Sequence, residues 1–207
     1  MTKRSITACC LYGFIDTGYL AGRDPAELAQ ALIAGGVDII QVRAKELSHA
    51  QRVELARAVV NAAQDVPVIV NDDIAAARET GAAGVHLGQE DFAGLTRDRL
   101  KDLRIVGIST HSLAQARQAE RDDADYIGVG PVFATGTKPG VKPVGLELVK
   151  EVTGQIAIPF FAIGGITLQN LDAVLAAGAT RIAVVSAILN GADVAAAAKN
   201  FKGKLSV

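Results

Sequence analysis

Carboxylate side chains follow two short apolar runs of this sequence, and their chemistry suits a magnesium ion. Residues 68–70 and 83–87 have the composition of buried strands, and each is followed by polar residues: Asn71-Asp72-Asp73 and Gly88-Gln89-Glu90-Asp91. A helix predicted over residues 74–80 makes these strands parallel and brings Asp72 and Asp91 to one edge of a sheet. Mg²⁺ takes one or two such carboxylates together with substrate phosphates. The alternative is that an aspartate of the first segment caps the predicted helix.

Other polar side chains also fall where predicted strands end. Gln41, Arg43 and Lys45 alternate along an extended segment, so they share one face. Further candidates follow the third strand and the fifth to eighth strands: Asn71; Ser109 and His111; Thr135, Thr137 and Lys138; Gly164 and Gly165; Ser186. Each of these alone is typical of a surface charge, a cap or a turn. Their joint placement at successive strand ends predicts one shared site.

The chemistry of these candidates suits two phosphorylated ligands. Arg43, Lys45 and Lys138, together with one Mg²⁺, would balance the charge of a pyrophosphate. The glycine pair and Ser186 would offer backbone N–H groups at helix N-termini, which is a site for a monophosphate. We therefore expect two small phosphorylated substrates to meet at one rim.

Strands and helices alternate along the chain at intervals of about two dozen residues, a rhythm typical of parallel sheets. The predicted strands cover residues 11–16, 37–42, 68–70, 83–87, 104–108, 126–129, 159–163 and 181–185. The predicted helices cover residues 25–34, 48–64, 74–80, 95–100, 113–121, 146–152, 167–177 and a last segment from 186 toward 201. This count favours a single (β/α)8 TIM barrel over residues 1–207. An open doubly wound sheet would need a Gly-rich turn after the first strand, where Asp16-Thr17-Gly18 is a poor match.

Composition excludes several other classes of protein. The 207 residues carry a net charge of −1, which does not indicate attraction to nucleic acid or to an anionic membrane. No apolar run approaches the roughly 18 residues that span a bilayer, and no signal peptide is expected, so we predict a cytoplasmic protein. Cys9 and Cys10 form no disulfide framework or zinc site and are expected to be structural thiols. A homo-oligomer is a further expectation, and the sequence does not give the oligomeric state.

Five segments together resemble one family, thiamine phosphate synthase. The similarity runs from about residue 11 to residue 189 and covers nearly the whole chain. It is carried by Gln41-Val42-Arg43-Ala44-Lys45, Val70-Asn71-Asp72-Asp73, His86-Leu87-Gly88-Gln89-Glu90-Asp91, the run from Gly130 to Lys138, and Ile163-Gly164-Gly165-Ile166-Thr167. The resemblance implies a (β/α)8 barrel that joins hydroxymethylpyrimidine pyrophosphate to hydroxyethylthiazole phosphate and releases pyrophosphate.

The resemblance also implies a role for each matching residue. The pyrimidine pyrophosphate would be held by Gln41, Val42, Arg43, Ala44, Lys45, Asn71, Ser109 and Lys138. The thiazole phosphate would be held by Thr135, Gly136, Thr137, Gly164, Gly165, Val185 and Ser186. Asp72 and Asp91 would bind Mg²⁺. Arg43, Lys45, Ser109 and Lys138 would serve catalysis, in which pyrophosphate leaves before the thiazole nitrogen attacks.

Two other functions remain open from the sequence. A thiazole tautomerase on the same fold resembles this chain around Thr110-His111-Ser112, but it has no pyrophosphate to hold and needs no Mg²⁺. A sensor of phosphorylated ligands is the second alternative, since fold alone does not imply catalysis. Gly13 departs from the apolar pattern expected of the first strand, and we expect it to mark a close approach to substrate.

Overall fold

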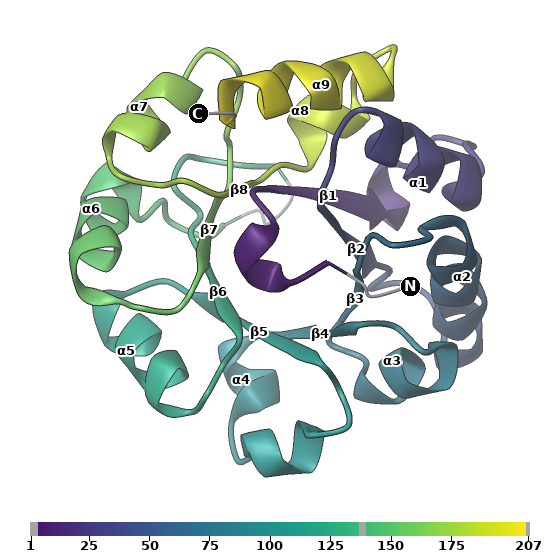
Figure 1. The fold of residues 1–207 in the computed structure, drawn as a ribbon, viewed down its shortest axis with the longest axis horizontal. Coiled ribbons are helices and arrows are strands. Elements are labelled where there is room, and N and C mark those ends of the chain that lie inside the picture. Colours follow the sequence, from purple (N-terminus) through teal and green to yellow (C-terminus); the bar gives the residue numbers. More distant parts are fainter. Residues whose placement is uncertain (1–3, 137–139, 206–207) are drawn as a thin grey trace.

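A closed barrel of parallel strands forms the centre of the molecule, as the sequence predicts (Figure 1). The structure is a computed structural model that describes residues 4–136 and 140–205. Each strand pairs with the next along the chain, and β8 closes the ring by pairing with β1. The strands are β1 Leu11–Asp16, β2 Ile39–Arg43, β3 Val68–Asn71, β4 Gly84–Leu87, β5 Ile105–Thr110, β6 Tyr126–Val129, β7 Phe160–Ile163 and β8 Ile182–Ala183.

Helices surround the barrel and cover the outward side chains of its strands (Figure 1). They are α1 Pro25–Ala34, α2 His49–Ala62, α3 Ile74–Thr80, α4 Gln89–Phe92, α5 Leu113–Arg121, α6 Gly145–Gln155, α7 Leu171–Ala176, α8 Ser186–Leu189 and α9 Val194–Leu205. Short 3₁₀ turns occur at η1 Ile6–Ala8, η2 Thr17–Tyr19 and η3 Arg97–Leu100. Local signals start several helices: Asp24 caps α1, and Ser48 forms a capping box with Gln51 at α2.

Several predicted boundaries are wrong. β5 runs on through Ser109 and Thr110, so Ser109 lies within the strand and not after it. The Thr110 hydroxyl donates to the Gly128 carbonyl 3.0 Å away and binds the strand end to β6. The last predicted helix is divided into α8 and α9, because Asp193 accepts the Ala196 amide and caps a new helix. The predicted helix over residues 95–100 is only the 3₁₀ turn η3, and α4 before it was not predicted.

Aromatic rings fill the barrel interior. Tyr12, Tyr126 and Phe161 pack edge to face, with ring centroids 5.2–5.9 Å apart. Gly107 makes room for them, because a Cβ there would lie 2.1 Å from the Tyr126 ring. Gly13 has a different role from the one we expected. Its Cβ would face the Val37 and Leu32 side chains, so this glycine permits helix packing and marks no approach to substrate.

The amino-terminal end of the barrel is covered by the chain's own first residues. Figure 1 shows η1 lying across this end. Arg181, which directly precedes β8, donates to the Thr7 carbonyl at 2.9 Å, and Arg104, before β5, donates to the Arg4 carbonyl at 3.2 Å. With this end covered, a ligand must enter from the opposite rim, where the strands end.

The Asp38 carboxylate connects several segments of the chain at this covered end. Its carboxylate accepts hydrogen bonds from the Cys10 and Leu11 amides at 3.0 Å, and it forms ion pairs with Lys202 and Arg4, both at 2.5 Å. Burial raises the pKa of the Asp38 carboxyl, but the hydrogen bonds from Lys202 and the two amides outweigh it, so the pKa lies below its usual value. Asp38 therefore joins β1, β2 and α9 through charge.

Asp38→Asn is expected to lower the free energy of unfolding at neutral pH by about 2–3 kcal/mol, because Lys202 then faces a neutral amide at a buried site. The folded-state pKa is depressed, so the contribution of Asp38 exists above its unfolded pKa and disappears as the pH falls through the folded one. Urea titrations should show the difference from wild type shrinking below about pH 4. A difference that stays constant at lower pH would contradict this account.

Candidate active site

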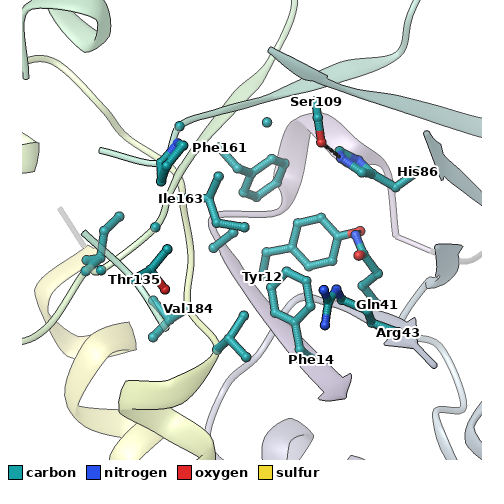
Figure 2. Close-up of a pocket in the computed structure, with 18 of the residues that line it drawn as sticks. Tyr12, Phe14, Gln41, Arg43, His86, Ser109, Thr135, Phe161, Ile163 and Val184 are labelled. Atoms are coloured by element: carbon teal, nitrogen blue, oxygen red, sulfur yellow. Dashed lines mark hydrogen bonds between the residues drawn. The ribbon is translucent and has the colours of Figure 1, made fainter. Parts of the chain in front are cut away.

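Two adjoining pockets open at the rim where the strands end. The central pocket lies over the barrel axis, and its walls are largely aromatic and aliphatic (Figure 2). Its polar lining comes from Gln41, Arg43, Asn71, His86, Ser109, His111, Thr135 and Ser186. The rim pocket lies beside it and is lined by Ala44, Lys45, Arg52, Asn71, Asp72, Asp73 and Ile74. Asn71 lines both pockets, so a ligand bound across it would extend from one to the other.

Gln41 and Arg43 share one face of β2, as the sequence predicts, whereas Lys45 lies beyond the end of this strand. Gln41 and Arg43 point into the central pocket, as Figure 2 shows for both, and Lys45 reaches the rim pocket. Val42 is 2% exposed and is not among the lining residues of either pocket in the described part of the chain. Its side chain belongs to the outward face of the strand. Any contact of Val42 with a ligand would therefore come from its backbone.

Asp16 is a site residue that the sequence prediction missed. It is 1% exposed, and its carboxylate accepts a hydrogen bond of 2.7 Å from Arg43 and one of 3.0 Å from the Gly18 amide. Burial of this carboxylate beside the guanidinium fixes the direction of Arg43, because an unpaired charge there would be costly. The available signal was the position of Asp16 at the end of β1, next to Arg43 in the sheet register.

The contacts around the rim pocket show which of Asp72 and Asp73 caps α3 and which faces the pocket. Asp73 caps α3, since its Oδ1 accepts the Ala76 amide at 2.9 Å, and its Oδ2 binds Arg52 and His49. Asp72 instead has a left-handed backbone with φ of 62°, which few non-glycine residues adopt. Its Oδ2 lies 3.8 Å from Lys45 Nζ and accepts a hydrogen bond from Asn71. The capping alternative therefore holds for Asp73 and leaves the Asp72 carboxylate facing the pocket.

Asp91 lies on α4, the short helix that follows β4. It is exposed, and it is not among the described residues that line either pocket. Its carboxylate folds back toward the end of β4, because a Cβ on Gly88 would lie 2.9 Å from Asp91 Oδ2. The amide of Asp72, which directly follows β3, donates a hydrogen bond of 2.9 Å to the carbonyl of His86 in β4. The two aspartates thus follow the paired strands β3 and β4, and a Mg²⁺ site shared between them stays a prediction.

The donor set at this edge fits a hard cation that retains other ligands. Asp72 and Asp91 supply only carboxylate oxygens. Within residues 4–136 and 140–205, no group of three or more His, Cys, Asp or Glu side chains is arranged as a complete metal cage. Mg²⁺ seldom needs one, since water and substrate phosphates complete its shell. Asp72 in its left-handed conformation is also the kind of backbone outlier that gathers at functional sites.

The glycine pair after β7 is held against the loop that follows β6. Gly164 and Gly165 have φ of 101° and 64°, and a Cβ on Gly165 would lie 2.5 Å from the Ala134 carbonyl oxygen. The prediction that these glycines lie at a helix N-terminus is wrong, because the helix expected from residue 167 starts only at Leu171. The positive φ angles turn the chain back under residues 133–135 instead. Gly164, Gly165, Thr135, Val185 and Ser186 nevertheless line one side of the central pocket.

The remaining predicted residues come from the loop after β6 and from the turn after β5. Thr137 and Lys138 lie outside the described residues. Gly136 is exposed at the edge of the same loop, and a Cβ there would meet open space. His111 lines the central pocket, and its Nδ1 is hydrogen-bonded to the Gly130 carbonyl.

His86, Tyr12 and Tyr126 also line the central pocket but were not predicted as site residues. His86 Nε2 lies 2.9 Å from Ser109 Oγ, and its Nδ1 lies 2.9 Å from the Tyr126 hydroxyl. Burial raises the pKa of both tyrosines above the usual range, so both keep their protons. A polar residue inside each otherwise apolar strand was the available signal, since a buried hydroxyl or imidazole needs a partner.

Comparison with known proteins gives one consistent result. A family model described as "Thiamine monophosphate synthase" matches residues 11–188. A thiamine-phosphate synthase of Chloroflexus aurantiacus is 42% identical over 200 residues, which cover 95% of this chain and 93% of the relative. One from Moorella thermoacetica is 43% identical over 196 residues, 93% of each chain. Among solved structures, a thiamine phosphate pyrophosphorylase from Pyrococcus furiosus matches with a TM-score of 0.85 at 30% identity, over 95% of each chain.

Proposed function

The chain belongs to the thiamine monophosphate synthase family, and from that membership we propose how its two pockets divide the work of the reaction. The family activity is that of a transferase in thiamine biosynthesis. It condenses hydroxymethylpyrimidine pyrophosphate with hydroxyethylthiazole phosphate to give thiamine phosphate and pyrophosphate. One bond to the pyrophosphate oxygen breaks, and one bond to the thiazole nitrogen forms at the same carbon.

The position of Asn71 in both pockets is the observation that carries the proposal. The pyrimidine ring would occupy the apolar central pocket beside Gln41 and Ser109, and its pyrophosphate would extend past Asn71 into the rim pocket. There Lys45 supplies a positive charge, and Arg43 approaches from the central side, held by Asp16. The reacting carbon would then lie near the boundary of the two pockets.

The chemistry asked of the protein is positioning and charge stabilisation. Pyrophosphate departure leaves a pyrimidine-methyl cation, which needs no protein nucleophile but must meet the thiazole before water does. Arg43 and Lys45 would balance the negative charge that grows on the departing oxygens. Asp72 and Asp91 would hold Mg²⁺, which acts as a Lewis acid on those oxygens when bound. Lys138, outside the described residues, would be a further cation for the same group.

The thiazole phosphate would bind on the opposite side of the central pocket. Gly164 and Gly165 bring the backbone close there, and Thr135 and Ser186 add hydroxyl groups. A monophosphate suits such neutral hydrogen-bond donors, because it carries less charge than a pyrophosphate and needs fewer cations. Thr137 and Gly136 of the same loop would complete this side.

Neither alternative function is favoured by a specific feature of the site. A tautomerase would use His111 as its acid and base, but that imidazole is hydrogen-bonded to the Gly130 carbonyl. The curated relatives carry the synthase name, which also sets aside a sensor without catalysis. Within the described residues, no helix is long and apolar enough to cross a membrane. Our assignments to the cytoplasm and to a homo-oligomer stay predictions.

The proposed division is tested by release of pyrophosphate. Purified protein with both substrates and Mg²⁺ is expected to release one pyrophosphate for each thiamine phosphate formed. Omitting the thiazole phosphate should leave only slow formation of the pyrimidine alcohol, and chelating Mg²⁺ should stop both products. Equal pyrophosphate release with and without the thiazole substrate would identify a hydrolase and overturn the proposal.

A further inference from the structure

A chain of side-chain hydrogen bonds crosses the barrel interior along the floor of the central pocket. Gln41 Nε2 lies 2.9 Å from the Tyr12 hydroxyl oxygen, which lies 2.9 Å from that of Tyr126. The Tyr126 oxygen lies 2.9 Å from His86 Nδ1, and His86 Nε2 lies 2.9 Å from Ser109 Oγ. Figure 2 shows the contact between His86 and Ser109 and the approach of Gln41 to Tyr12. The chain therefore connects Gln41 and Ser109, which we place beside the pyrimidine, through three side chains of the pocket floor.

The donors and acceptors of this chain fit together in one order once Gln41 Nε2 donates. Tyr12 accepts that bond, and its own O–H has one acceptor among the described residues, the Tyr126 oxygen. Tyr126 then donates to His86 Nδ1, which must be the unprotonated ring nitrogen. His86 carries its proton on Nε2 and donates it to Ser109 Oγ. Among the described residues, His86 Nε2 is the hydrogen-bond partner of Ser109 Oγ, so the Ser109 hydroxyl proton can point into the pocket.

We propose that Tyr12, Tyr126 and His86 are positioning residues that fix what Gln41 and Ser109 present to the pyrimidine. Gln41 presents its carbonyl oxygen as an acceptor, and Ser109 presents its hydroxyl proton as a donor. An aminopyrimidine offers both partners, an exocyclic amino donor and a ring-nitrogen acceptor. A 4-oxopyrimidine has an acceptor in place of the amino donor and therefore meets a mismatched group. This inference rests on the proposed function for the identity of the ligand, but the direction of the chain does not depend on it.

The interior of the barrel is built to maintain this direction. Tyr12 and Tyr126 are at most 2% exposed, so water cannot replace a broken link in the chain. Both phenols stay protonated because burial raises their pKa values. The space for the Tyr126 hydroxyl exists only because residue 107 is glycine, since a Cβ there would lie 2.5 Å from that oxygen. Reversing the chain would require the Gln41 amide, both hydroxyls and the His86 tautomer to change together.

The tautomer of His86 in the ligand-free protein is the first test. Nitrogen-15 NMR of protein labelled at its three histidines distinguishes a protonated ring nitrogen from an unprotonated one, and His86→Gln assigns the signals by their loss. The expected result is a single species with the proton on Nε2. A proton on Nδ1, or a mixture of both tautomers, would overturn the proposal. Because no substrate is present, this outcome is independent of whether the proposed function is correct.

Tyr126→Phe is the second test, since it removes one hydroxyl from the middle of the chain and keeps the ring against Phe161. The preference in kcat/KM for the aminopyrimidine pyrophosphate over its 4-oxo analogue is expected to fall at least about tenfold, because sites built around hydrogen bonds discriminate most strongly. The variant should also lose its single His86 tautomer. Tyr12→Phe removes the hydroxyl that lies between Gln41 and Tyr126, and it replaces Tyr126→Phe in this test if that variant does not fold.

Phe161→Leu is the matched control, because it disturbs the packing of the same rings without removing a hydrogen bond of the chain. It should keep both the substrate preference and the Nε2 tautomer, even if its stability falls. An unchanged preference in the two tyrosine variants, or an equal loss in Phe161→Leu, would mean that packing alone orders the pocket, and the positioning role would be rejected.

Discussion

Asp72→Asn is expected to reduce kcat/KM by roughly 100- to 1,000-fold, because losing a metal carboxylate removes several kcal/mol of charge stabilisation and 1.4 kcal/mol is tenfold in rate. Asn tolerates the left-handed backbone that Asp72 adopts, so the fold should be unaffected. The defect should be partly relieved by raising the Mg²⁺ concentration, which distinguishes a ligand from a substrate contact. Asp91→Asn is expected to act in the same direction. Steady-state rates over a Mg²⁺ titration measure both effects.

The neighbouring Asp73 provides a matched control for this prediction. Asp73 caps α3 and binds Arg52, so Asp73→Ala should lower the free energy of unfolding by about 1 kcal/mol or somewhat more. Its dependence on Mg²⁺ should stay close to that of wild type. The variants of the two adjacent aspartates would then have different defects: Asp72→Asn in turnover and Asp73→Ala in stability. If Asp72→Asn keeps its activity at limiting Mg²⁺, Asp72 is not a ligand.

Gly165→Val should weaken binding of the thiazole phosphate by at least about tenfold, since each hydrogen bond lost to a charged group costs about 1.5–3 kcal/mol. The valine Cβ would lie 2.5 Å from the Ala134 carbonyl oxygen and 2.8 Å from the Phe133 Cβ, so the loop that carries Thr135 must move away. The left-handed φ of 64° adds backbone strain. Binding of the pyrimidine pyrophosphate, which we assign to the β2 and β3 side, should change much less. Calorimetric titration with each substrate separately gives the two dissociation constants.

Gly154→Val is the control, because it makes the same substitution of valine for glycine away from the proposed phosphate site. Gly154 lies on α6, and a Cβ there would meet no atom within 4 Å. This variant should bind both substrates as wild type does. Equal losses for the two substrates in Gly165→Val would point to general misfolding and would remove the support for a local phosphate site after β7.

The fold could be predicted because its signals are local. Apolar runs that alternate with capped helices predicted eight parallel strands, and residues such as Asp24, Pro25 and Ser48 mark helix starts by their own hydrogen-bond chemistry. The ends of weakly periodic segments were harder to place. The sequence around Ser109 shows no break where we ended the fifth strand, and only pairing with β6 extends that strand to Thr110.

Some features of the site could only be found in three dimensions. Asp72 and Asp73 are the same residue type in adjacent positions, and the backbone turn decides which of them caps α3 and which faces the rim pocket. Asp16 holds Arg43 across two strands that are far apart in sequence. The glycine pair was expected beside a helix N-terminus, but its positive φ angles fit it under the loop after β6.

The sequence by itself determined the barrel, the family resemblance and the rim on which the polar residues gather, because strand period and chain order decide which end of a parallel strand carries them. Only the tertiary structure decided how these side chains pair. Tyr12, Gln41, His86, Ser109 and Tyr126 come from five strands, and their hydrogen bonds depend on barrel closure. Barrel closure fixes the stagger of the strands and so the level of each residue along the barrel axis. No single segment of the chain encodes that level.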